Sequence, residues 1–475
     1  TTGSNNTSIG RESLRVTTTG SNNVGVGSYA MYDNTTGGSN VAIGESALSN
    51  NTTASNNTAV GKSALLANTT GNRVTAVGTS ALAANTTGTE NIAIGYQALD
   101  ANSTGNSNVA VGSEALGANS TANYNTAVGG NSLASNTTGI QNTAVGALSL
   151  DANTTASNNT AVGFFALSAN TTAAQNTAVG SSALQNTTTG GNNTAVGQNS
   201  MLTNTTGSSN SAFGINSLNL NTTGAGNSGF GQQTLNANTS ASYNTAVGFQ
   251  AMITNTTGHS STGIGTFALN DHTTGTYNAA FGMKALEHVT TGYRNVAVGY
   301  DAGGSLTTGS YGIYIGMEAS ASSATTSEIM IGSATGRGNN TGYIYPPGGG
   351  SMYQASNSTT WSQVSDERIK KNIVDNNDGL NKLKDIQVRN FEYRKLDEIV
   401  DFENPSAAVV DKEGIQLGVI AQEIETILPN VVTQESTGVK TVNTDNLTWY
   451  LVNAVKELST QVDELKQELL ALKGE

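Results

Sequence analysis

The chain has 475 residues, of which only 11% are charged, and it contains 56 Gly, 4 Pro and no Cys. Without cysteine there is no disulfide and no thiolate metal site, and the formal net charge of −13 argues against DNA or anionic membranes as partners. No run of about 18 apolar residues predicts membrane insertion, and no secretory signal peptide is visible.

Charge is distributed unevenly along the chain. Residues 1–364 hold 12 acidic and 7 basic side chains, a net charge of −5, whereas residues 365–475 hold 21 and 13, a net charge of −8. This difference in charge density predicts at least two physically different modules. Because the chain opens inside a repeat, at Thr1-Thr2-Gly3, we also expect further residues upstream of it.

A repeat of 17 residues fills most of the first module. It reads N-T-A-V-G-x-x-A-L-x-x-N-T-T-G-x-x and runs without slippage from Asn6 to Asn295, which makes 18 repeats; a nineteenth, Gly312–Gly316, is degenerate. The fourth position is always Val, Ile or Phe, and the fifth is always Gly. The ninth position is Leu or Met, except at Gly303.

Seventeen residues are too few for a helical hairpin, but they suit one coil of a β-solenoid. We expect each coil to hold a short strand, a Gly corner, a second short strand and an Asn/Gly turn. Stacking would align the fourth and ninth positions into two apolar ladders that form a thin core, and the Asn side chains into hydrogen-bonded ladders. At about 4.8 Å per coil, 18 coils make a rod of roughly 80 Å. The thin core favours three copies packed side by side, a homotrimer.

The Asn-Thr-Ala-Val-Gly pentad, with the following Ala-Leu and Asn-Thr-Thr-Gly, resembles the head repeats of trimeric autotransporter adhesins. That resemblance implies a left-handed β-roll. The adhesin unit is shorter, however, so the handedness of this solenoid stays open. The many Asn-x-Thr triplets match glycosylation sequons, but we interpret them as a consequence of the recurring turn.

Aromatic residues gather where the repeat ends, over residues 334–364. They include Tyr343, Tyr345, Tyr353 and Trp361, around a Pro-Pro-Gly-Gly-Gly linker. Exposed aromatic rings at a fibre tip can stack on the sugars of a receptor, so these four are candidate receptor contacts. The alternative interpretation, which we favour, is an apolar cap that seals the last coil.

The segment Ser365–Ile373 begins the charged module with the sequence Ser-Asp-Glu-Arg-Ile-Lys-Lys-Asn-Ile. Read alone, Ser365 is a helix N-cap followed by two acidic residues in the first turn. Further along the chain come the motifs Phe391-Glu392-Tyr393, Gly418–Ile424 and Leu428–Val432, and then a stretch from Leu447 to Leu458.

In this order, the motifs resemble the intramolecular chaperone auto-processing domain that ends phage endosialidases, several tail spikes and neck appendages. The resemblance implies a small α+β domain that helps three chains assemble and then cuts itself off between Ser365 and Asp366. It also implies that Ser365 and Lys370 form the catalytic dyad. A Lys can act as the base for a Ser hydroxyl if burial or a cationic neighbour lowers its pKa.

Residues 448–475 carry a heptad pattern typical of a coiled coil. One set of seam positions is Thr448, Val455, Val462 and Leu469, and the other is Leu451, Leu458, Leu465 and Leu472. Val with Leu favours two strands, but a short tail attached to a trimeric domain can be overruled, so we retain the trimer. The predicted domains are therefore a solenoid (1–333), a junction (334–364), a chaperone domain (365–447) and a coiled coil (448–475).

These features predict a structural fibre of a phage tail or related injection particle, extracellular on the virion, that contacts a glycan or protein receptor on the host surface. One alternative is a bacterial trimeric surface adhesin, which the chaperone-like C-terminal sequence disfavours. A second is a glycan-degrading tailspike, disfavoured because the few acidic residues of the solenoid are scattered singly. We expect no cofactor, and with 3 His and no Cys we expect no metal.

Overall fold

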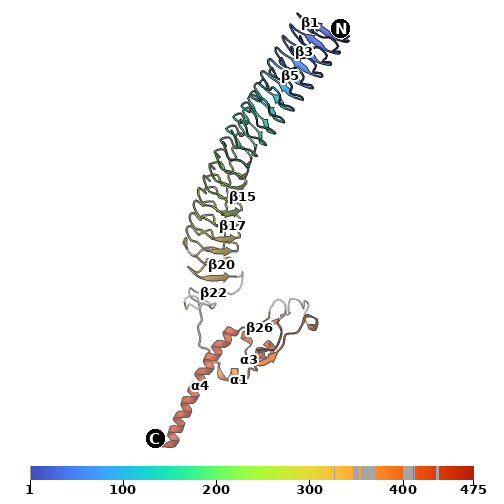
Figure 1. The fold of residues 1–475 in the computed structure, drawn as a ribbon. Coiled ribbons are helices and arrows are strands. Elements are labelled where there is room, and N and C mark those ends of the chain that lie inside the picture. Colours follow the sequence, from blue (N-terminus) through green and yellow to red (C-terminus); the bar gives the residue numbers. More distant parts are fainter. Residues whose placement is uncertain are drawn as a thin grey trace. The chain divides into compact units, whose positions relative to one another are not determined.

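The computed structural model describes residues 2–325, 327–345, 352–354, 367, 370–399, 410, 412–434 and 438–474. The chain divides into two compact units, Thr1–Val364 and Ser365–Glu475. The first is a parallel β-solenoid and the second a small α+β unit that ends in a long helix (Figure 1).

The solenoid carries one three-residue strand per coil, and successive strands pair in parallel without any shift of register, as in Ala161↔Ala178. The first nineteen strands are β1 (Thr7–Ile9), β2 (Val24–Val26), β3 (Val41–Ile43), β4 (Thr58–Val60), β5 (Thr75–Val77), β6 (Ile92–Ile94), β7 (Val109–Val111), β8 (Thr126–Val128), β9 (Thr143–Val145), β10 (Thr160–Val162), β11 (Thr177–Val179), β12 (Thr194–Val196), β13 (Ser211–Phe213), β14 (Ser228–Phe230), β15 (Thr245–Val247), β16 (Thr262–Ile264), β17 (Ala279–Phe281), β18 (Val296–Val298) and β19 (Ile313–Ile315). The predicted 17-residue solenoid coil is thereby confirmed.

The second strand that we expected in each coil is replaced by a run of turns over residues 2–325. These turns still bond from coil to coil: the Leu65 N–H donates to the Ala81 carbonyl at 2.9 Å. Left-handed backbone at the seventh and ninth positions prevents a strand here, as at Ser63 (φ 56°) and Leu65 (φ 55°). A bulky residue with positive φ is unusual. The ninth-position side chain adopts it because this conformation directs it into the core, where Leu65 is completely buried.

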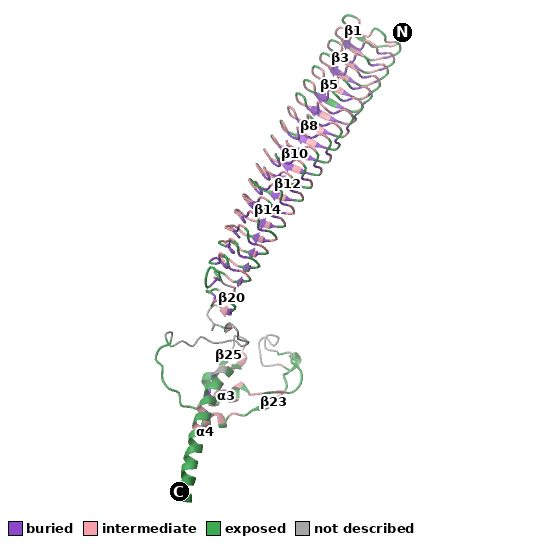
Figure 2. Cartoon of the chain, turned by 60° about the vertical axis from the view of Figure 1, so that its left-hand side comes forward, coloured by how far each residue is buried: buried purple, intermediate pink, exposed green. Residues whose placement is uncertain are grey.

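The core differs from our prediction at the fourth position of the repeat. In the coil 159–175, the buried apolar side chains are those of Ala161, Ala166, Leu167 and Ala173, whereas Val162 is only half-buried. Successive residues of a strand point to opposite faces, so the small third position points inward and the large fourth position outward. The fourth-position ladder therefore exists, but it lies on the outer face of the sheet, where Phe213 and Phe230 stack at 5.0 Å. Figure 2 shows the buried positions in line along the solenoid.

Two ladders of buried Asn side chains run along the stack, as predicted. At the first position, the Asn159 N–H bonds the Asn142 side-chain oxygen at 3.0 Å, and the Asn159 Nδ2 donates to the Ala173 carbonyl at 3.0 Å. At the twelfth position, Nδ2 of Asn170 donates to Oδ1 of Asn153 at 2.9 Å. The Asn side chains thus satisfy backbone groups at the tight corners, which would otherwise be buried without a partner.

Substitutions interrupt the twelfth-position ladder at Thr187 and end it after His272, where Val289 and Leu306 occupy the next two coils. Thr187 cannot supply the next amide, so Oδ1 of Asn170 is buried with no partner among the described residues. His272 keeps more of the hydrogen bonds of the ladder than Thr187 does. Its Nδ1 lies 2.9 Å from Asn255 Oδ1, and its Nε2 lies 3.2 Å from Asn278 Nδ2. Burial lowers the pKa of His272 to about 4, so the ring is neutral and donates through Nδ1.

The exceptional Gly303 makes room for an aromatic ring at the end of the stack. The third position of the degenerate nineteenth coil is Tyr314 rather than Ala, and its ring is completely buried. A side chain at Gly303 or Gly312 would collide with this ring, since an added Cβ would lie 3.1 and 2.5 Å from it. The inward column then continues through Met330, which pairs in register with Tyr314, and through Tyr343, which pairs with Met330.

Three further strands close the solenoid. They are β20 (Ile329–Gly332) and β21 (Gly342–Tyr345), which continue the parallel sheet, and β22 (Met352–Gln354), which pairs antiparallel with β21. The parallel stacking therefore ends at β21, since the strand that follows it in the sheet is antiparallel.

The C-terminal unit contains α1 (Leu380–Lys384), β23 (Arg389–Phe391), the 3₁₀ turn η2 (Leu396–Glu398), β24 (Gln416–Gly418), α3 (Ala421–Ile427), the 3₁₀ turn η3 (Pro429–Val431), β25 (Val432–Gln434), β26 (Lys440–Val442) and α4 (Thr444–Lys473). β23 pairs antiparallel with β24, and β25 with β26. The core is small and centres on Ile424, Leu428, Val431 and Tyr450.

Helix α4 begins at Thr444, before the heptad segment that we expected from residue 448. Its first half packs on the rest of the unit through Tyr450 and Ala454, which are buried. The seam side chains of the heptads are largely exposed in the single chain, as Leu458 (50%) and Leu465 (63%) illustrate (Figure 2).

Candidate functional site

The predicted cleavage site lies mostly outside the described residues. Ser365 and Asp366 are not described, so the predicted dyad remains a prediction. Glu367 and Lys370 are described; both are exposed, and the Lys370 N–H donates to the Glu367 carbonyl at 3.0 Å. In the single chain, therefore, the candidate base lies at the surface.

The residues just after this motif are held against helix α4. Asn453 Nδ2 donates to the carbonyls of Asn376 (2.7 Å) and Asp378 (3.1 Å), and Glu457 Oε2 accepts the N–H of Leu380 at 3.0 Å. Glycine is needed at residue 379, since an added Cβ would lie 2.6 Å from the Ala454 nitrogen. Our sequence analysis missed Asn453 and Glu457, because both lie off the heptad seam and resemble ordinary solvated helix residues.

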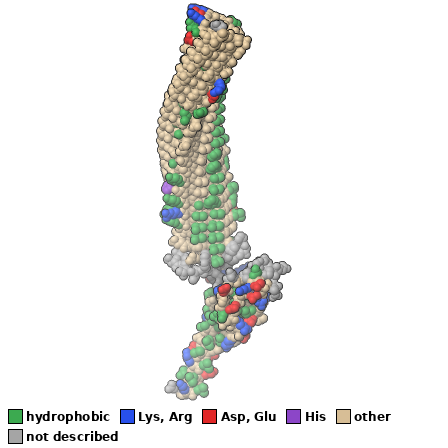
Figure 3. All heavy atoms as spheres, turned by 45° about the vertical axis from the view of Figure 1, so that its right-hand side comes forward, with side chains coloured by type: hydrophobic (Ala, Val, Ile, Leu, Met, Phe, Trp, Pro, Cys, Tyr) green, Lys and Arg blue, Asp and Glu red, His purple; other side chains and the backbone are tan. Residues whose placement is uncertain are grey.

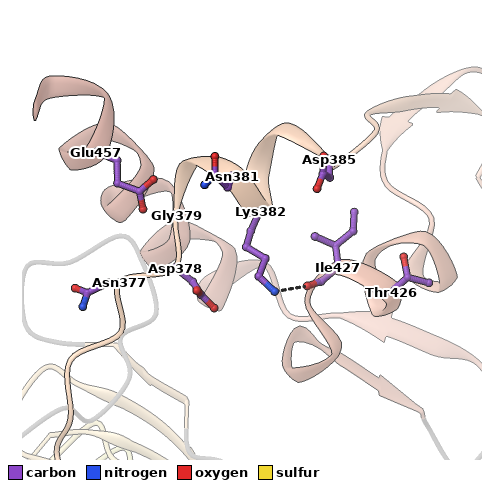
Figure 4. Close-up of a pocket in the computed structure, with 9 residues that line it drawn as sticks. All are labelled: Asn377, Asp378, Gly379, Asn381, Lys382, Asp385, Thr426, Ile427 and Glu457. Carbon is purple, nitrogen blue, oxygen red and sulfur yellow. Dashed lines mark hydrogen bonds between the residues drawn. The ribbon is translucent and has the colours of Figure 1, made fainter. Parts of the chain in front are cut away.

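A polar hollow of about 520 Å³ lies beside this contact (Figure 4). Its lining residues are Asn377, Asp378, Gly379, Asn381, Lys382, Asp385, Thr426, Ile427 and Glu457. Lys382 crosses it, and its Nζ donates to the Ile427 carbonyl at the end of α3 at 3.4 Å. Three carboxylates and one ammonium make this hollow unlike the mostly apolar pockets that bind small ligands. Its side chains instead join α1 to α3 and α4.

The motifs that carry the chaperone resemblance have structural roles in this unit. Glu423 forms a two-bond ion pair with Arg389 of β23, at 2.9 and 3.3 Å. Asn430 Nδ2 donates to the Tyr450 hydroxyl of α4 at 2.8 Å. Leu428 and Val431 form part of the core. These motifs therefore hold the small domain together and place α4 on it.

The structure describes only some of the aromatic side chains of the junction. Tyr343 is 4% exposed; it continues the core column, and Arg337 stacks on its ring at 4.7 Å. Tyr345 is half-buried, with its ring 6.0 Å from that of Tyr343. The Tyr353 backbone pairs with Tyr343, but its side chain, like the whole of Trp361, lies outside the described residues. Tyr343 thus packs as a cap of the last coil.

Two carboxyl groups of the solenoid have raised pKa values. Burial raises the pKa of Asp100, and the nearby charge of Glu114 adds to the effect; burial also raises the pKa of Asp151. Among the described residues, no group of three or more His, Cys, Asp or Glu side chains could hold a metal ion. No helix within that part of the chain is long and apolar enough to cross a membrane.

Comparison with known proteins identifies part of the C-terminal unit. The peptidase S74 family, described as the chaperone of endosialidase, matches residues 365–433. Residues 365–433 therefore form a domain of the chaperone-of-endosialidase type, as the motifs predicted. Searches of curated proteins and of solved structures found no match. The match begins at Ser365, the residue at which the predicted cleavage motif starts.

Proposed function

We propose that this chain is a homotrimeric fibre of a phage tail or related injection particle, which contacts a glycan or protein receptor on the host surface. Its C-terminal domain assembles three copies and then cleaves the bond between Ser365 and Asp366. The observation that carries this proposal is the chaperone-of-endosialidase domain of residues 365–433, which follows a β-solenoid in the same chain. Such chaperone domains are associated with trimeric assembly.

Two exposed apolar surfaces support self-association. The outer face of the solenoid sheet presents the second and fourth positions of every coil, and none of these residues is charged. Its fourth positions form a long apolar band (Figure 3), whereas most second positions are Thr or Ser. Nineteen strands spaced about 4.8 Å apart, each covering about 7 Å along its length, give this outer face an area on the order of 600 Å² per chain. That area is near the roughly 800 Å² that each partner buries in a standard interface. The exposed seam of α4 is the second surface.

Trimer assembly also supplies a physical reason why cleavage would wait for folding. A Lys acts as a base near neutral pH only when its surroundings lower its pKa, which burial does. Lys370 is exposed in the single chain, so neighbouring copies would have to cover it. The Ser365 hydroxyl would then attack the carbonyl carbon of Ser365, or orient a water to do so, while Lys370 accepts the proton. Overall one water is consumed, and Asp366 leaves with a free amino group.

The deciding experiment is the intact mass of freshly folded protein under denaturing conditions. We expect two fragments from the native chain, separated after Ser365, and one full-length mass from Ser365→Ala and from Lys370→Met. Ser362→Ala and Lys371→Met are matched controls that change a neighbouring residue of the same type and should still cleave. Cleavage in Ser365→Ala would refute the dyad.

The trimer is tested separately by sedimentation velocity in a Ser365→Ala background, where the chain stays whole. We expect three copies per particle. Leu465→Asp, on the α4 seam, should weaken association, whereas Glu464→Asp, off the seam, should leave it unchanged. Monomeric Ser365→Ala protein would contradict the trimer while leaving the cleavage result intact.

A further inference from the structure

A group of exposed aromatic and basic side chains lies near the C-terminal end of the solenoid. Tyr277, Arg294 and Tyr311 occupy the seventeenth position of three successive coils, two residues before the first residues of β17, β18 and β19. Tyr293 and His259 stand one residue earlier in their own coils, at the sixteenth position. All five side chains are exposed, and about half of Tyr277 (52%) and Tyr311 (53%) remains open to solvent.

These side chains form one stacked cluster. The Arg294 guanidinium lies over both neighbouring rings, 5.8 Å from the centre of Tyr277 and 5.5 Å from that of Tyr311, and it donates to the Tyr311 hydroxyl at 3.0 Å. Tyr293 packs edge-on against Tyr311 at 5.2 Å, and His259 against Tyr277 at 5.3 Å. A hydrogen bond from Tyr293 and the charge of Arg294 lower the pKa of the Tyr311 hydroxyl.

The fold does not require large residues at these places. The seventeenth position has left-handed backbone, which favours Asn, and in most other coils it is Asn, Ser or Gln. Tyr277 (φ 59°), Arg294 (φ 57°) and Tyr311 (φ 61°) adopt the same backbone without being buried. Their large side chains therefore carry the strain of this conformation without the burial that offsets it at the ninth position.

Arg294 also differs from two other arginines of the solenoid, Arg15 and Arg73, in its charge balance. Arg15 pairs with Glu12 at 3.1 Å, and Arg73 pairs with Glu90 at 2.6 Å. Within the described part of the chain, no carboxylate lies within ion-pair distance of Arg294. Its planar fork, held between two rings, is thus available to an external carboxylate, which such a fork binds with two parallel hydrogen bonds.

A hollow of about 230 Å³, lined by both polar and apolar groups, continues the cluster. Tyr311 lines it together with Ser327, Glu328, Ile329, Asn340, Thr341, Gly342 and Gln354. Glu328 is nearly fully buried, and its carboxylate accepts the N–H groups of Ser322 (2.6 Å) and Gly338 (2.8 Å), which fixes the loop around the hollow. The hollow therefore offers hydroxyl and amide groups beside an aromatic ring, a combination suited to a polyhydroxylated ligand.

We propose that this cluster binds an acidic oligosaccharide. The apolar faces of its sugar rings stack on Tyr277 and Tyr311, its carboxylate bonds the Arg294 guanidinium, and a neighbouring sugar places its hydroxyls in the hollow beside Tyr311. The inference rests on the proposed host-attachment function and names the chemistry of the receptor. It also places that contact on Tyr277, Arg294 and Tyr311 and on the adjoining hollow, rather than on the rings of the junction residues Tyr343 and Tyr345.

The test uses the full chain on an array of uronic-acid, sialic-acid and neutral oligosaccharides. We expect binding to acidic members over neutral ones, and a loss of at least about tenfold in affinity for Tyr277→Ala and Arg294→Ala. Arg294→Lys keeps the charge but loses the fork, so it should bind at an intermediate level. Tyr124→Ala is the matched control: Tyr124 has the same coil position, φ of 59° and 64% exposure, but no arginine stacks on it.

Several outcomes would overturn this inference: no binding on the array, no preference for acidic glycans, or equal losses in Tyr124→Ala and Tyr277→Ala. Thermal unfolding of each variant shows whether a loss reflects misfolding instead; since the changed side chains are exposed, we expect unchanged midpoints. Self-cleavage is measured on the same preparations. Normal cleavage and trimer formation without glycan binding would remove the glycan site but retain the proposed fibre, for which a protein receptor would then be the partner.

Discussion

The two units of this chain complete their cores in different ways. In the solenoid, each coil meets nearly identical coils on either side, so one pattern of Ala, Leu and Asn satisfies both the apolar and the polar groups along the whole stack. In the C-terminal unit, a small core is surrounded by charged residues, and the apolar seam of α4 stays exposed. Each coil of the repeat is packed by its neighbouring coils. The small unit instead leaves the apolar side chains of the α4 seam exposed, where other copies of the chain can cover them.

The stacked repeat also determines how the stability of the solenoid responds to substitutions. In a stack where each coil contacts only its neighbours, the cost of a substitution depends on its position within the coil. The first two predictions below probe that dependence, and the last two probe places where the solenoid itself departs from its repeat.

The largest effect is expected at the fifth-position glycine. Gly129 has φ of 135°, and an added Cβ would lie 2.6 Å from the Gly146 carbonyl of the next coil. Gly129→Ala should therefore lower the free energy of unfolding by about 4 kcal/mol, through backbone strain and steric overlap. Its neighbour Gly130 is the control, since nothing lies within 4 Å of a Cβ there. Urea unfolding of both variants measures the difference; equal costs would contradict the predicted stacking.

The next prediction distinguishes the inside of a coil from its outside. Leu167→Ala removes a completely buried side chain and should cost about 2–5 kcal/mol. Val162→Ala, in the same coil but on the outer face, should cost less than about 1 kcal/mol in the isolated chain. Urea unfolding at low protein concentration makes this comparison. Because Val162 lies on the proposed interface, its substitution should become more costly as the protein concentration rises.

The third prediction concerns pH and the buried His272. Its pKa is about 4 in the folded chain and 6.5 in the unfolded one, so the unfolded state binds the proton more readily between these values. The contribution of neutral His272 to the free energy of unfolding is therefore fully present above pH 6.5. It falls by up to about 3 kcal/mol as the pH drops to 4. In His272→Asn, this pH-dependent part of the free energy of unfolding should vanish, whatever the stability of the variant at pH 7. Urea titrations of both proteins at pH 7, 5.5 and 4.5 isolate it, because other groups contribute equally to both.

The smallest effect is a gain in stability. Thr187→Asn restores the twelfth-position ladder and gives the buried Oδ1 of Asn170 a donor, so we expect about 1 kcal/mol of added stability. The reverse change at a regular coil, Asn153→Thr, should cost a similar amount by leaving Asn136 Oδ1 without its donor. The midpoint of thermal unfolding measures both, and a loss of stability in Thr187→Asn would contradict the assigned role of the ladder.

Much of the solenoid could be predicted from spacing alone. The invariant 17-residue period, the strand before each Gly and the Asn ladders follow from residues such as Asn159 and Gly163, which recur without slippage. The chaperone domain could also be predicted, since Glu423 and Asn430 lie in motifs whose order is distinctive. The catalytic roles of Ser365 and Lys370 come from that resemblance and await the cleavage experiment.

The direction of the side chains could not be predicted in the same way. Val162 and Leu167 are both large and apolar, so the sequence suggests both for the core, but a 17-residue coil is too narrow to hold them together. The clustering of Tyr277, Arg294 and Tyr311 was also missed, although their 17-residue spacing in a stacked solenoid was a signal that could have revealed it.

The sequence by itself therefore determined the repeat, the number of regular coils and the family of residues 365–433, because each depends on spacing or on motif order. Tertiary structure decided which apolar residues are buried, which of them face outward, and which surface side chains meet. The physical reason is the narrow cross-section of the coil: only a small residue, usually Ala, fits opposite the inward-turning Leu, so the larger Val, Ile and Phe side chains must point outward.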